Sequence, residues 1–555
     1  MSLLSKFISH KTPDEKKKLK EEKFLLILSG VLLGISFPPF PFPFTLLLFV
    51  GFIPYLIVLK NRQTLAEINR ATYLMSFVFC VVTVYWVGSW QAEADPFLMM
   101  GGGAMLLALP AVMIIPSTLY YLSSKIFKTK FSFWLFPVFW VTAEYLLTLT
   151  DLKFPWLILG HGLAKFTSFI QAADIIGAFG LSLVVLYINL ILYKAYSHYK
   201  EERKNSVKYF VIAASILLVF IVYGMIKIST FNPSDKKVKV GLVQPNINPW
   251  KKWELGSVQN MVENYLQLSQ QAVDGGAQII LWPETALPVY LMNGAHRAAL
   301  DSIYIFLEEN NVSLLTGMPH IKFYPDSTKA PTDAKFSVNG NYHYTTYNSV
   351  ILVKPGTREY QQYGKMHLVP LGEHVPFADQ FSFLADVFKW GVGLGGWNVG
   401  KDTVVFTTSV KVSGEDELIN INGQVCYESI FPLFAPNFVQ RGAELIAVVT
   451  NDSWYGNSSG PYQHKEFAVL RAVENRRAIV RCANGGISCI INPLGVTEAE
   501  TEMFTKTVLV GDVSLQNEKS FYSEHPTIII TIISVLSLWI VGLNILLFIK
   551  NKFKL

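Results

Sequence analysis

Long apolar segments constrain the fold of this chain more than any other feature of its sequence. Spanning the roughly 30 Å of hydrocarbon in a bilayer takes about 20 mostly apolar residues in a helix. Eight such segments occur, seven before residue 230 and one near the C-terminus: Phe24–Phe40, Thr45–Val58, Ala71–Trp90, Phe97–Leu122, Phe131–Leu149, Ile175–Tyr196, Tyr209–Ile228 and Ile528–Ile549. We therefore predict a multi-pass α-helical membrane bundle of about eight helices.

Charged residues are scarce, and their positions indicate the topology. Only 16% of the 555 residues are charged, against about 25% in an average soluble domain. The net charge of +6 is spread over short runs between apolar segments instead of forming a basic groove, so we predict no nucleic-acid partner. Lys and Arg are concentrated in alternate loops, at residues 16–23, 60–70, 125–130, 194–208 and 550–554. Since cationic loops stay in the cytoplasm, we predict cytoplasmic termini and an external segment between the last two spans.

That external segment alternates strands and helices in the manner of an α/β domain. The predicted strands are Val238–Val243, Gln278–Trp282, Val312–Gly317, Leu418–Val425 and Glu444–Thr450. The predicted helices are Ser257–Val273, Arg297–Glu309 and Tyr462–Ala478. Such alternation favours one α/β domain. The predicted organisation is a membrane domain at 1–230, a globular domain at 231–523 and a final membrane helix at 524–555.

Four side chains of this domain, two of them at the ends of predicted strands, are suited to nucleophilic chemistry. Glu284 follows one strand, Cys426 follows another, and Lys365 and Glu373 lie in a single segment between them. Catalytic groups in open α/β sheets commonly lie just past the strand ends. Taken singly, each has an ordinary explanation, because a strand-end Glu or Lys is usually a solvated charge and a lone Cys is usually a small core residue.

Together these segments resemble the nitrilase (carbon–nitrogen hydrolase) superfamily, and more closely its membrane branch, the apolipoprotein N-acyltransferases. Further stretches share the resemblance: Phe154–Trp156 before Gly160, Gln244–Ile247 followed by Trp253, Thr450–Gly456 and Arg471–Asn475. The resemblance implies an α/β nitrilase-like αββα sandwich joined to the helical bundle. It also implies a catalytic triad of Glu284, Lys365 and Cys426. The supporting or substrate-site residues that it implies are Glu373, Tyr427, Glu428 and Trp253.

The chemistry of a cysteine nucleophile agrees with these implied roles. A free thiol has a pKa of about 8.5, so little thiolate exists at neutral pH. Glu284 can accept the proton, and the ammonium of Lys365 can stabilise the thiolate and later an oxyanion. The backbone N–H of Tyr427 is the natural second oxyanion donor, and Glu373 would orient Lys365 or relay protons. The other cysteines, Cys80, Cys482 and Cys489, are expected to be structural.

The resemblance implies a two-step acyl transfer at a bacterial inner membrane. Cys426 would take an acyl chain from a phospholipid, and the α-amine of a diacylglyceryl-modified lipoprotein would accept it. The domain would then face the periplasm. The four cysteines lack the spacing of a metal site, so we expect neither a metal nor a cofactor.

Two other functions remain open at this point, and one segment has two interpretations. A membrane-tethered amidase or nitrilase would use water to resolve the acyl-enzyme. A transporter or scaffold carrying an inactive domain is less favoured, because all three catalytic residue types are present and charges within the spans are sparse. The aromatic and glycine-rich segment Phe377–Trp397 is either a packed loop or a mobile arm that reaches the lipid surface.

Overall fold

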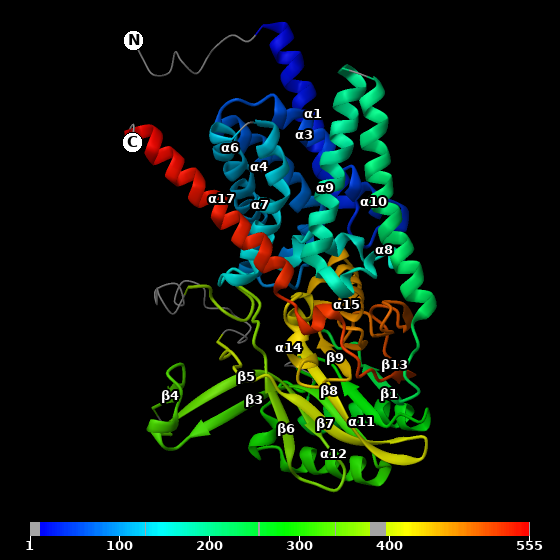
Figure 1. Cartoon of the computed structure of the whole chain (residues 1–555). Helices are drawn as coiled ribbons and strands as arrows, with labels where there is room; N and C mark the ends of the chain where they lie inside the picture. Colours follow the sequence, from blue (N-terminus) through cyan, green and yellow to red (C-terminus); the bar gives the residue numbers. More distant parts are fainter. Residues whose placement is uncertain are drawn as a thin grey trace.

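The computed structural model describes residues 12–127, 129–201, 203–252, 256–338, 340–377 and 396–553. Within these residues, helices gather at one end of the molecule and strands at the other (Figure 1). The helices of the first end are α1 (Pro13–Ile35), α2 (Phe42–Thr45), α3 (Ile53–Lys60), α4 (Leu65–Val84), α5 (Pro96–Val112), α6 (Ile114–Ile126), α7 (Thr129–Leu149), α8 (Thr167–Ile170), α9 (Ala173–Glu201), α10 (Arg203–Thr230) and α17 (Ile528–Phe553).

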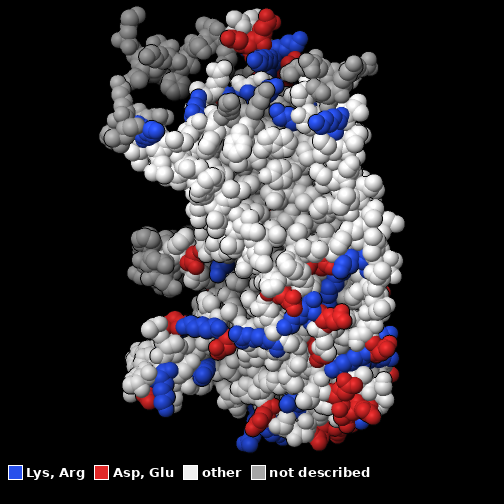
Figure 2. All heavy atoms as spheres, viewed as in Figure 1, with Lys and Arg blue, Asp and Glu red and all other residues white. Residues whose placement is uncertain are grey.

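Seven helices of the described chain are long and apolar enough to cross a membrane: Phe42–Lys60, Leu65–Gly88, Pro96–Ile126, Phe131–Leu149, Ala173–Tyr199, Ser206–Thr230 and Ile528–Lys550. Their outward faces expose large apolar side chains such as Leu218 and Trp539. Figure 2 shows an uncharged band across the middle of one face, between a rim rich in Lys and Arg and a domain with charges of both signs. The predicted multi-pass helical bundle is confirmed.

The first predicted span differs from the helix that forms there. We expected a helix over Phe24–Phe40, whereas α1 covers Pro13–Ile35 and carries its charges in the first half. Thr12 caps its N-terminus, since the hydroxyl accepts a hydrogen bond from the Glu15 N–H and the Glu15 carboxylate accepts one from the Thr12 N–H. The helix ends before Pro38 and Pro39 because proline has no N–H and its ring clashes with the preceding turn. The apolar half of α1 is therefore shorter than a full span.

The second apolar segment is a broken helix that one buried amide holds together. It consists of α2, a 3₁₀ turn (η2, Leu46–Phe49) and α3. The side chain of Asn189, on α9, accepts a hydrogen bond from the Phe52 N–H at 2.9 Å and donates one to the Leu48 carbonyl at 2.7 Å. An unpaired backbone group costs several kcal/mol at membrane depth. Asn189 thus pairs the groups that the break would leave exposed.

Two β-sheets make up the domain between α10 and α17. One has the strand order β13-β1-β2-β3-β5-β4, with β6 also paired to β5, and the other has the order β12-β11-β10-β9-β8-β7. The strands are β1 (Lys237–Gln244), β2 (Ile279–Trp282), β3 (Ser313–Tyr324), β4 (Lys335–Ser337), β5 (Tyr342–Val353), β6 (Tyr360–Gly364), β7 (Val405–Val412), β8 (Glu415–Val425), β9 (Leu445–Thr450), β10 (Ala478–Ala483), β11 (Cys489–Ile491), β12 (Thr497–Glu500) and β13 (Thr507–Ser514). Strands β1, β2 and β3 are parallel, as are β8, β9 and β10. Within each parallel set, the C-terminal ends therefore lie along one edge.

Helices cover the outer faces of both sheets. Helices α11 (Val258–Asp274) and α12 (Arg297–Asn310) pack on the first sheet, while α14 (Ala435–Val439) and α15 (Ser459–Asn475) pack on the second. The sheets themselves touch, because the Cys482 thiol donates hydrogen bonds to the carbonyls of Val243 and Leu281 at 3.3 and 3.2 Å. This is the predicted αββα sandwich, and the fold class is confirmed.

Helix α15 joins the sandwich to the bundle (Figure 1). The buried side-chain amide of Gln463 makes four hydrogen bonds with the bundle. Its oxygen accepts from the indole N–H groups of Trp86 and Trp156 at 3.0 and 2.7 Å. Its nitrogen donates to the carbonyls of Thr83 and Pro38, both at 2.9 Å. One side chain on the domain thus fixes three separate segments of the bundle.

Several predicted elements have somewhat different bounds in the structure, and one predicted feature lies mostly outside the described residues. The helix expected at Tyr462–Ala478 ends at Asn475, because Arg476 adopts a left-handed φ of +48° and Ala478 already belongs to β10. The strand expected at Val312–Gly317 continues to Tyr324, since it pairs along its length with β5. Most of Phe377–Trp397, namely residues 378–395, lies outside the described residues.

Candidate active site

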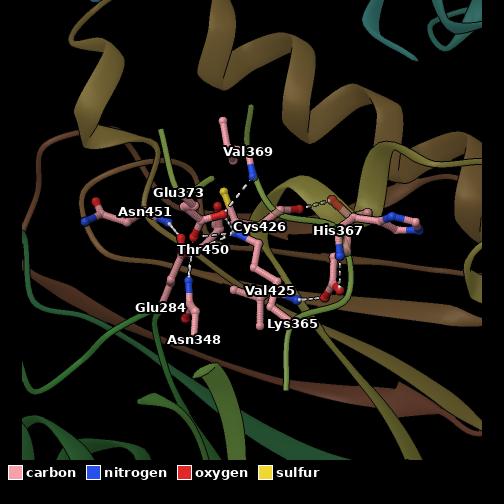
Figure 3. Close-up of polar contacts among 12 residues, drawn as sticks. Glu284, Asn348, Lys365, His367, Val369, Glu373, Val425, Cys426, Thr450 and Asn451 are labelled. Carbon is pink, nitrogen blue, oxygen red and sulfur yellow. Dashed lines mark hydrogen bonds and ion pairs between the residues drawn. The ribbon is translucent and has the colours of Figure 1, made fainter. Parts of the chain in front are cut away.

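Cys426 occupies a sharp turn at the end of β8. Its φ is +48°, a left-handed conformation that is uncommon for a residue with a Cβ. The carboxylate of Glu428 holds the turn, because it accepts hydrogen bonds from the N–H groups of Val425 at 2.8 Å and Met366 at 2.6 Å. Cys426 lies beside Lys365 and the carboxylates of Glu284 and Glu373 (Figure 3). The surroundings thus maintain a strained backbone at the one partly exposed cysteine among the described residues.

Glu284 lies just past the C-terminal end of β2 and is only 7% exposed. One carboxylate oxygen accepts from the Asn348 side chain at 2.8 Å, and the other accepts from the Asn451 N–H at 3.1 Å. Gly317 on β3 allows the close approach that this position needs, since a Cβ there would lie 2.5 Å from the Cα of Glu284. The packing of β2 against β3 therefore determines where the carboxylate lies.

Lys365 is brought to Glu284 by the pairing of β6 with β5. Gly364 pairs with Ser349, which places Lys365 beside Asn348. The Lys365 ammonium is 3.4 Å from a Glu284 oxygen and 2.7 Å from a Glu373 oxygen. The Asn348 amide donates to both carboxylates at 2.8 Å. Asn348 therefore connects the two acids that flank the lysine.

The charges in this cluster are mutually dependent. Burial raises the pKa of Glu284, as does the charge of Glu373, while the Lys365 charge and a hydrogen bond with Cys426 lower it. Burial also raises the pKa of the Cys426 thiol, and the charge of Glu284 raises it further. Burial alone would lower the pKa of Lys365, but Glu373 and Glu284 raise it above its usual range. The resting site thus holds a protonated lysine and a neutral thiol beside a carboxylate whose proton affinity is increased.

Two cavities meet at Cys426. The first holds the charged and amide side chains of the centre among apolar neighbours, and its lining includes Lys252, Glu284, Asn348, Lys365, Glu373 and Asn451. The second is mostly apolar, and its lining includes Trp86, Leu98, Gly101, Met105, Phe154 and Trp156 from the bundle. Leu98, Val369, Cys426 and Tyr455 line both cavities. The candidate nucleophile therefore lies where the sandwich and the membrane helices meet.

A second hydrogen-bond network contacts the backbone of the turn at Cys426. The ring of His464, on α15, is 3.0 Å from the Cys426 carbonyl through Nε2 and 2.8 Å from Asp452 through Nδ1. Cys426, Asp452 and His464 place three possible metal ligands within 4.8 Å of one another. The guanidinium of Arg481, however, already donates to Asp452 and contacts the His464 ring at 3.0 Å. The Arg481 guanidinium already supplies a positive charge at this place. The cluster is therefore better explained as a hydrogen-bond network that positions Cys426 than as a metal site.

The remaining predicted residues lie around this centre. The Tyr427 hydroxyl donates to the Lys153 carbonyl of the bundle at 2.7 Å. The Glu428 side chain is fully buried, and burial raises its pKa to about 7. Trp253 lies outside the described residues. Cys80, Cys482 and Cys489 are buried.

Three polar residues of this centre escaped the sequence analysis. Asn348 is within a strand and His464 is within a helix. Lys252 directly precedes Trp253, which the sequence analysis named. The Lys252 ammonium donates to the Thr285 carbonyl, and burial lowers its pKa to about 8. A polar residue at a buried position is a sign of a functional role. Hydrophobic periodicity does not reveal whether a single polar residue is buried, so the sequence alone could not single out these three.

Comparison with known proteins places the chain in a family. Residues 29–191 match the apolipoprotein N-acyltransferase N-terminal domain, and residues 239–522 match the carbon-nitrogen hydrolase family. An apolipoprotein N-acyltransferase from Chlorobaculum tepidum is 30% identical over 518 residues, covering 92% of this chain and 94% of that protein. The chain belongs to the apolipoprotein N-acyltransferase family. The resemblance inferred from the sequence is confirmed.

Other apolipoprotein N-acyltransferases and more distant structures are also similar. The apolipoprotein N-acyltransferase of Geobacter metallireducens is 30% identical over 526 residues, which cover 92% of this chain and 93% of that protein. A solved amidase of the nitrilase superfamily from Nesterenkonia AN1 covers 53% of this chain and 95% of its own, with 17% identity and a TM-score of 0.35. Membership of the apolipoprotein N-acyltransferase family makes this chain a membrane-associated acyltransferase.

Proposed function

We propose that this protein transfers an acyl chain from a membrane phospholipid to the α-amine of a lipoprotein's diacylglyceryl-modified N-terminal cysteine. The observation that carries the proposal is the position of Cys426, where the cavity that holds the charged side chains meets an apolar cavity walled by bundle helices. A hydrolase of small soluble amides needs no membrane wall beside its nucleophile. Two lipid-anchored substrates do need one, because their reacting groups stay near the membrane surface.

In the first half-reaction, Glu284 accepts the thiol proton of Cys426 and the thiolate attacks the phospholipid ester carbonyl. The C–S bond forms, and the Lys365 ammonium and the Tyr427 N–H stabilise the tetrahedral oxyanion. When this intermediate collapses, the ester C–O bond breaks and the proton on Glu284 passes to the departing glycerol oxygen. The products are a thioester on Cys426 and a lysophospholipid.

In the second half-reaction, the neutral α-amine of the acceptor attacks the thioester. Glu284 takes a proton from the attacking nitrogen, the C–N bond forms, and the C–S bond breaks. The proton on Glu284 then returns to the sulfur of Cys426, so the site ends as it began. Asn348 and Glu373 hold the base and the cation in place throughout both steps.

The proposal includes a location in the bacterial inner membrane, with the sandwich on the periplasmic side and both termini in the cytoplasm. The distribution of charge supports it. The rim of the bundle farthest from the sheets is rich in Lys and Arg (Figure 2), and cationic residues favour the cytoplasmic side.

Intact-protein mass spectrometry tests the proposal directly. After incubation with phospholipid micelles, the protein should carry one acyl adduct, which a diacylglyceryl-cysteine peptide should discharge as N-acylated peptide. The Cys426→Ala variant should form no adduct, whereas Cys482→Ala, at a buried packing position, should form as much as wild type. Release of free fatty acid in place of N-acylated peptide would identify the protein as a hydrolase. Full transfer by Cys426→Ala would refute the thioester.

A further inference from the structure

One face of α5 forms a wall of the apolar cavity. The residues that line it from this helix are Leu98, Gly101, Gly102 and Met105, whose spacing places them on a single helical face. Other faces of α5 expose Met100 and Leu107, at 69% and 58%. The wall between the cavity and the surrounding hydrocarbon is therefore a single helix thick.

The two glycines in this wall have different reasons to be small. A Cβ at Gly102 would lie 2.3 Å from the Cα of Gly88, so glycine is required there for the packing of α5. A Cβ at Gly101 would meet only Leu371, whose nearest atom is 3.4 Å away, an ordinary contact distance. Glycine inside a helix costs about 1 kcal/mol relative to alanine. Neither packing nor a positive φ explains that cost at Gly101.

The part of the cavity lining around Trp86 is tightly packed. The Trp86 ring packs against Trp156 and Tyr455, each with ring centroids 4.7 Å apart. A Cβ on Gly460 would already be 2.7 Å from the Trp86 ring. Trp86 therefore cannot move aside to restore the cavity space that a group added at Gly101 would take up.

We propose that Gly101 determines which acyl chains the enzyme accepts, by leaving the α5 wall of the apolar cavity recessed beside Leu371. This inference rests on the proposed function and assigns the apolar cavity to the acyl chain on Cys426. A side chain at position 101 takes up space in the cavity, so long chains are rejected and short ones are retained. Removing bulk at Met105, on the same face, has the opposite effect.

A competition between two acyl donors tests this assignment on the full-length protein. The donors are phosphatidylethanolamines with dodecanoyl or hexadecanoyl chains, mixed equally in detergent micelles, and the readout is the ratio of the two adducts on Cys426. Hydrophobic pockets discriminate about 10- to 200-fold per methylene, so Gly101→Leu should lower the hexadecanoyl-to-dodecanoyl ratio at least about tenfold. Gly101→Ala should lower it less, and Met105→Ala should raise it.

Gly103 provides the matched control. It is on the same helix and does not line the cavity, and its Cβ would meet only Trp90 at 4.0 Å. Gly103→Leu and Gly103→Ala should therefore keep the wild-type ratio. An unchanged ratio in both Gly101 variants, or the same shift in the Gly103 variants, would overturn the inference. Should Gly101→Leu form no adduct at all, Gly101→Ala decides, because its methyl group fits. Absence of any adduct on wild-type Cys426 would instead refute the proposed function.

Discussion

A proton moves more easily between two buried side chains than from one of them to water. Burial raises the pKa of both Glu284 and Cys426. Transfer from the thiol to the carboxylate leaves the number of negative charges in the cavity unchanged, so it adds no new charge to desolvate. Lys365 stays protonated and stabilises the anion on whichever residue holds it. Burial thus suppresses ionisation of each group alone but does not oppose proton transfer between the Cys426 thiol and the Glu284 carboxylate.

Glu284 and Lys365 should both be needed in the first half-reaction. Glu284→Gln keeps the shape of the side chain but cannot accept a proton, and Lys365→Met removes the charge beside the oxyanion. Losing a single oxyanion stabiliser typically lowers the rate about 10²- to 10³-fold. We expect at least this loss in the rate of adduct formation, measured by quenched-flow mass spectrometry. Lys401→Met, at an exposed lysine, is the control; wild-type rates in either site variant would exclude the assigned role.

The pH dependence of adduct formation should depend on Glu373. The base acts only when deprotonated, so the rate should rise with pH through an apparent pKa above the usual 4.5 of glutamate, because burial raises the pKa of Glu284. The negative charge of Glu373 raises that pKa further. Glu373→Gln should therefore move the acidic limb of the profile to lower pH. A shift to higher pH would show that Glu373 acts on Glu284 in another way.

At the scale of elements, regular patterns could be predicted and exceptions could not. The strands β1, β2 and β9 begin and end within a residue of their predicted bounds, because each is a mostly apolar run. The first span was misplaced, since its helix starts in a charged segment that hydropathy excludes.

The site could be predicted in part for the same reason. Glu284, Lys365 and Cys426 belong to short motifs at strand ends. Asn348 and His464 have no such motif, and only pairing between distant segments brings them to the site.

The link between α15 and the bundle should be sensitive to one amide. Gln463→Leu would leave the Trp156 indole N–H and the Pro38 carbonyl buried without partners, while Trp86 and Thr83 keep the hydrogen bond between them. Each unpaired buried group costs about 1–3 kcal/mol, so we expect a loss of at least about 2 kcal/mol and a clearly lower midpoint of thermal unfolding in detergent. Gln271→Leu, on the exposed side of α11, should unfold at nearly the wild-type temperature. Equal unfolding midpoints for the two variants would show that the Gln463 amide does not stabilise the contact between α15 and the bundle.

At the scale of the whole molecule, the proposed topology can be tested from both sides of the membrane. In a background without native cysteines, Asp326→Cys should react in intact cells with a thiol reagent that cannot cross the inner membrane. Asp326 lies on the exposed tip of the sandwich, between β3 and β4. Gln63→Cys, in the exposed loop between α3 and α4, should react only after the membrane is opened. The reverse pattern would contradict the positive-inside assignment and the lipoprotein acceptor together.

The first and last strands of the sandwich are neighbours, and this has a consequence for biogenesis. Strand β1 pairs with β13 along all eight positions, from Lys237 opposite Ser514 to Gln244 opposite Thr507. During synthesis, β1 therefore emerges about 270 residues before its partner, and its edge stays open until nearly the whole domain has been made. Among the described elements, α16 (Phe521–Glu524) and α17 follow β13. Closure of the sheet and insertion of α17 thus become nearly simultaneous events, and a nascent chain stalled before Thr507 would present an unpaired edge strand for aggregation or proteolysis.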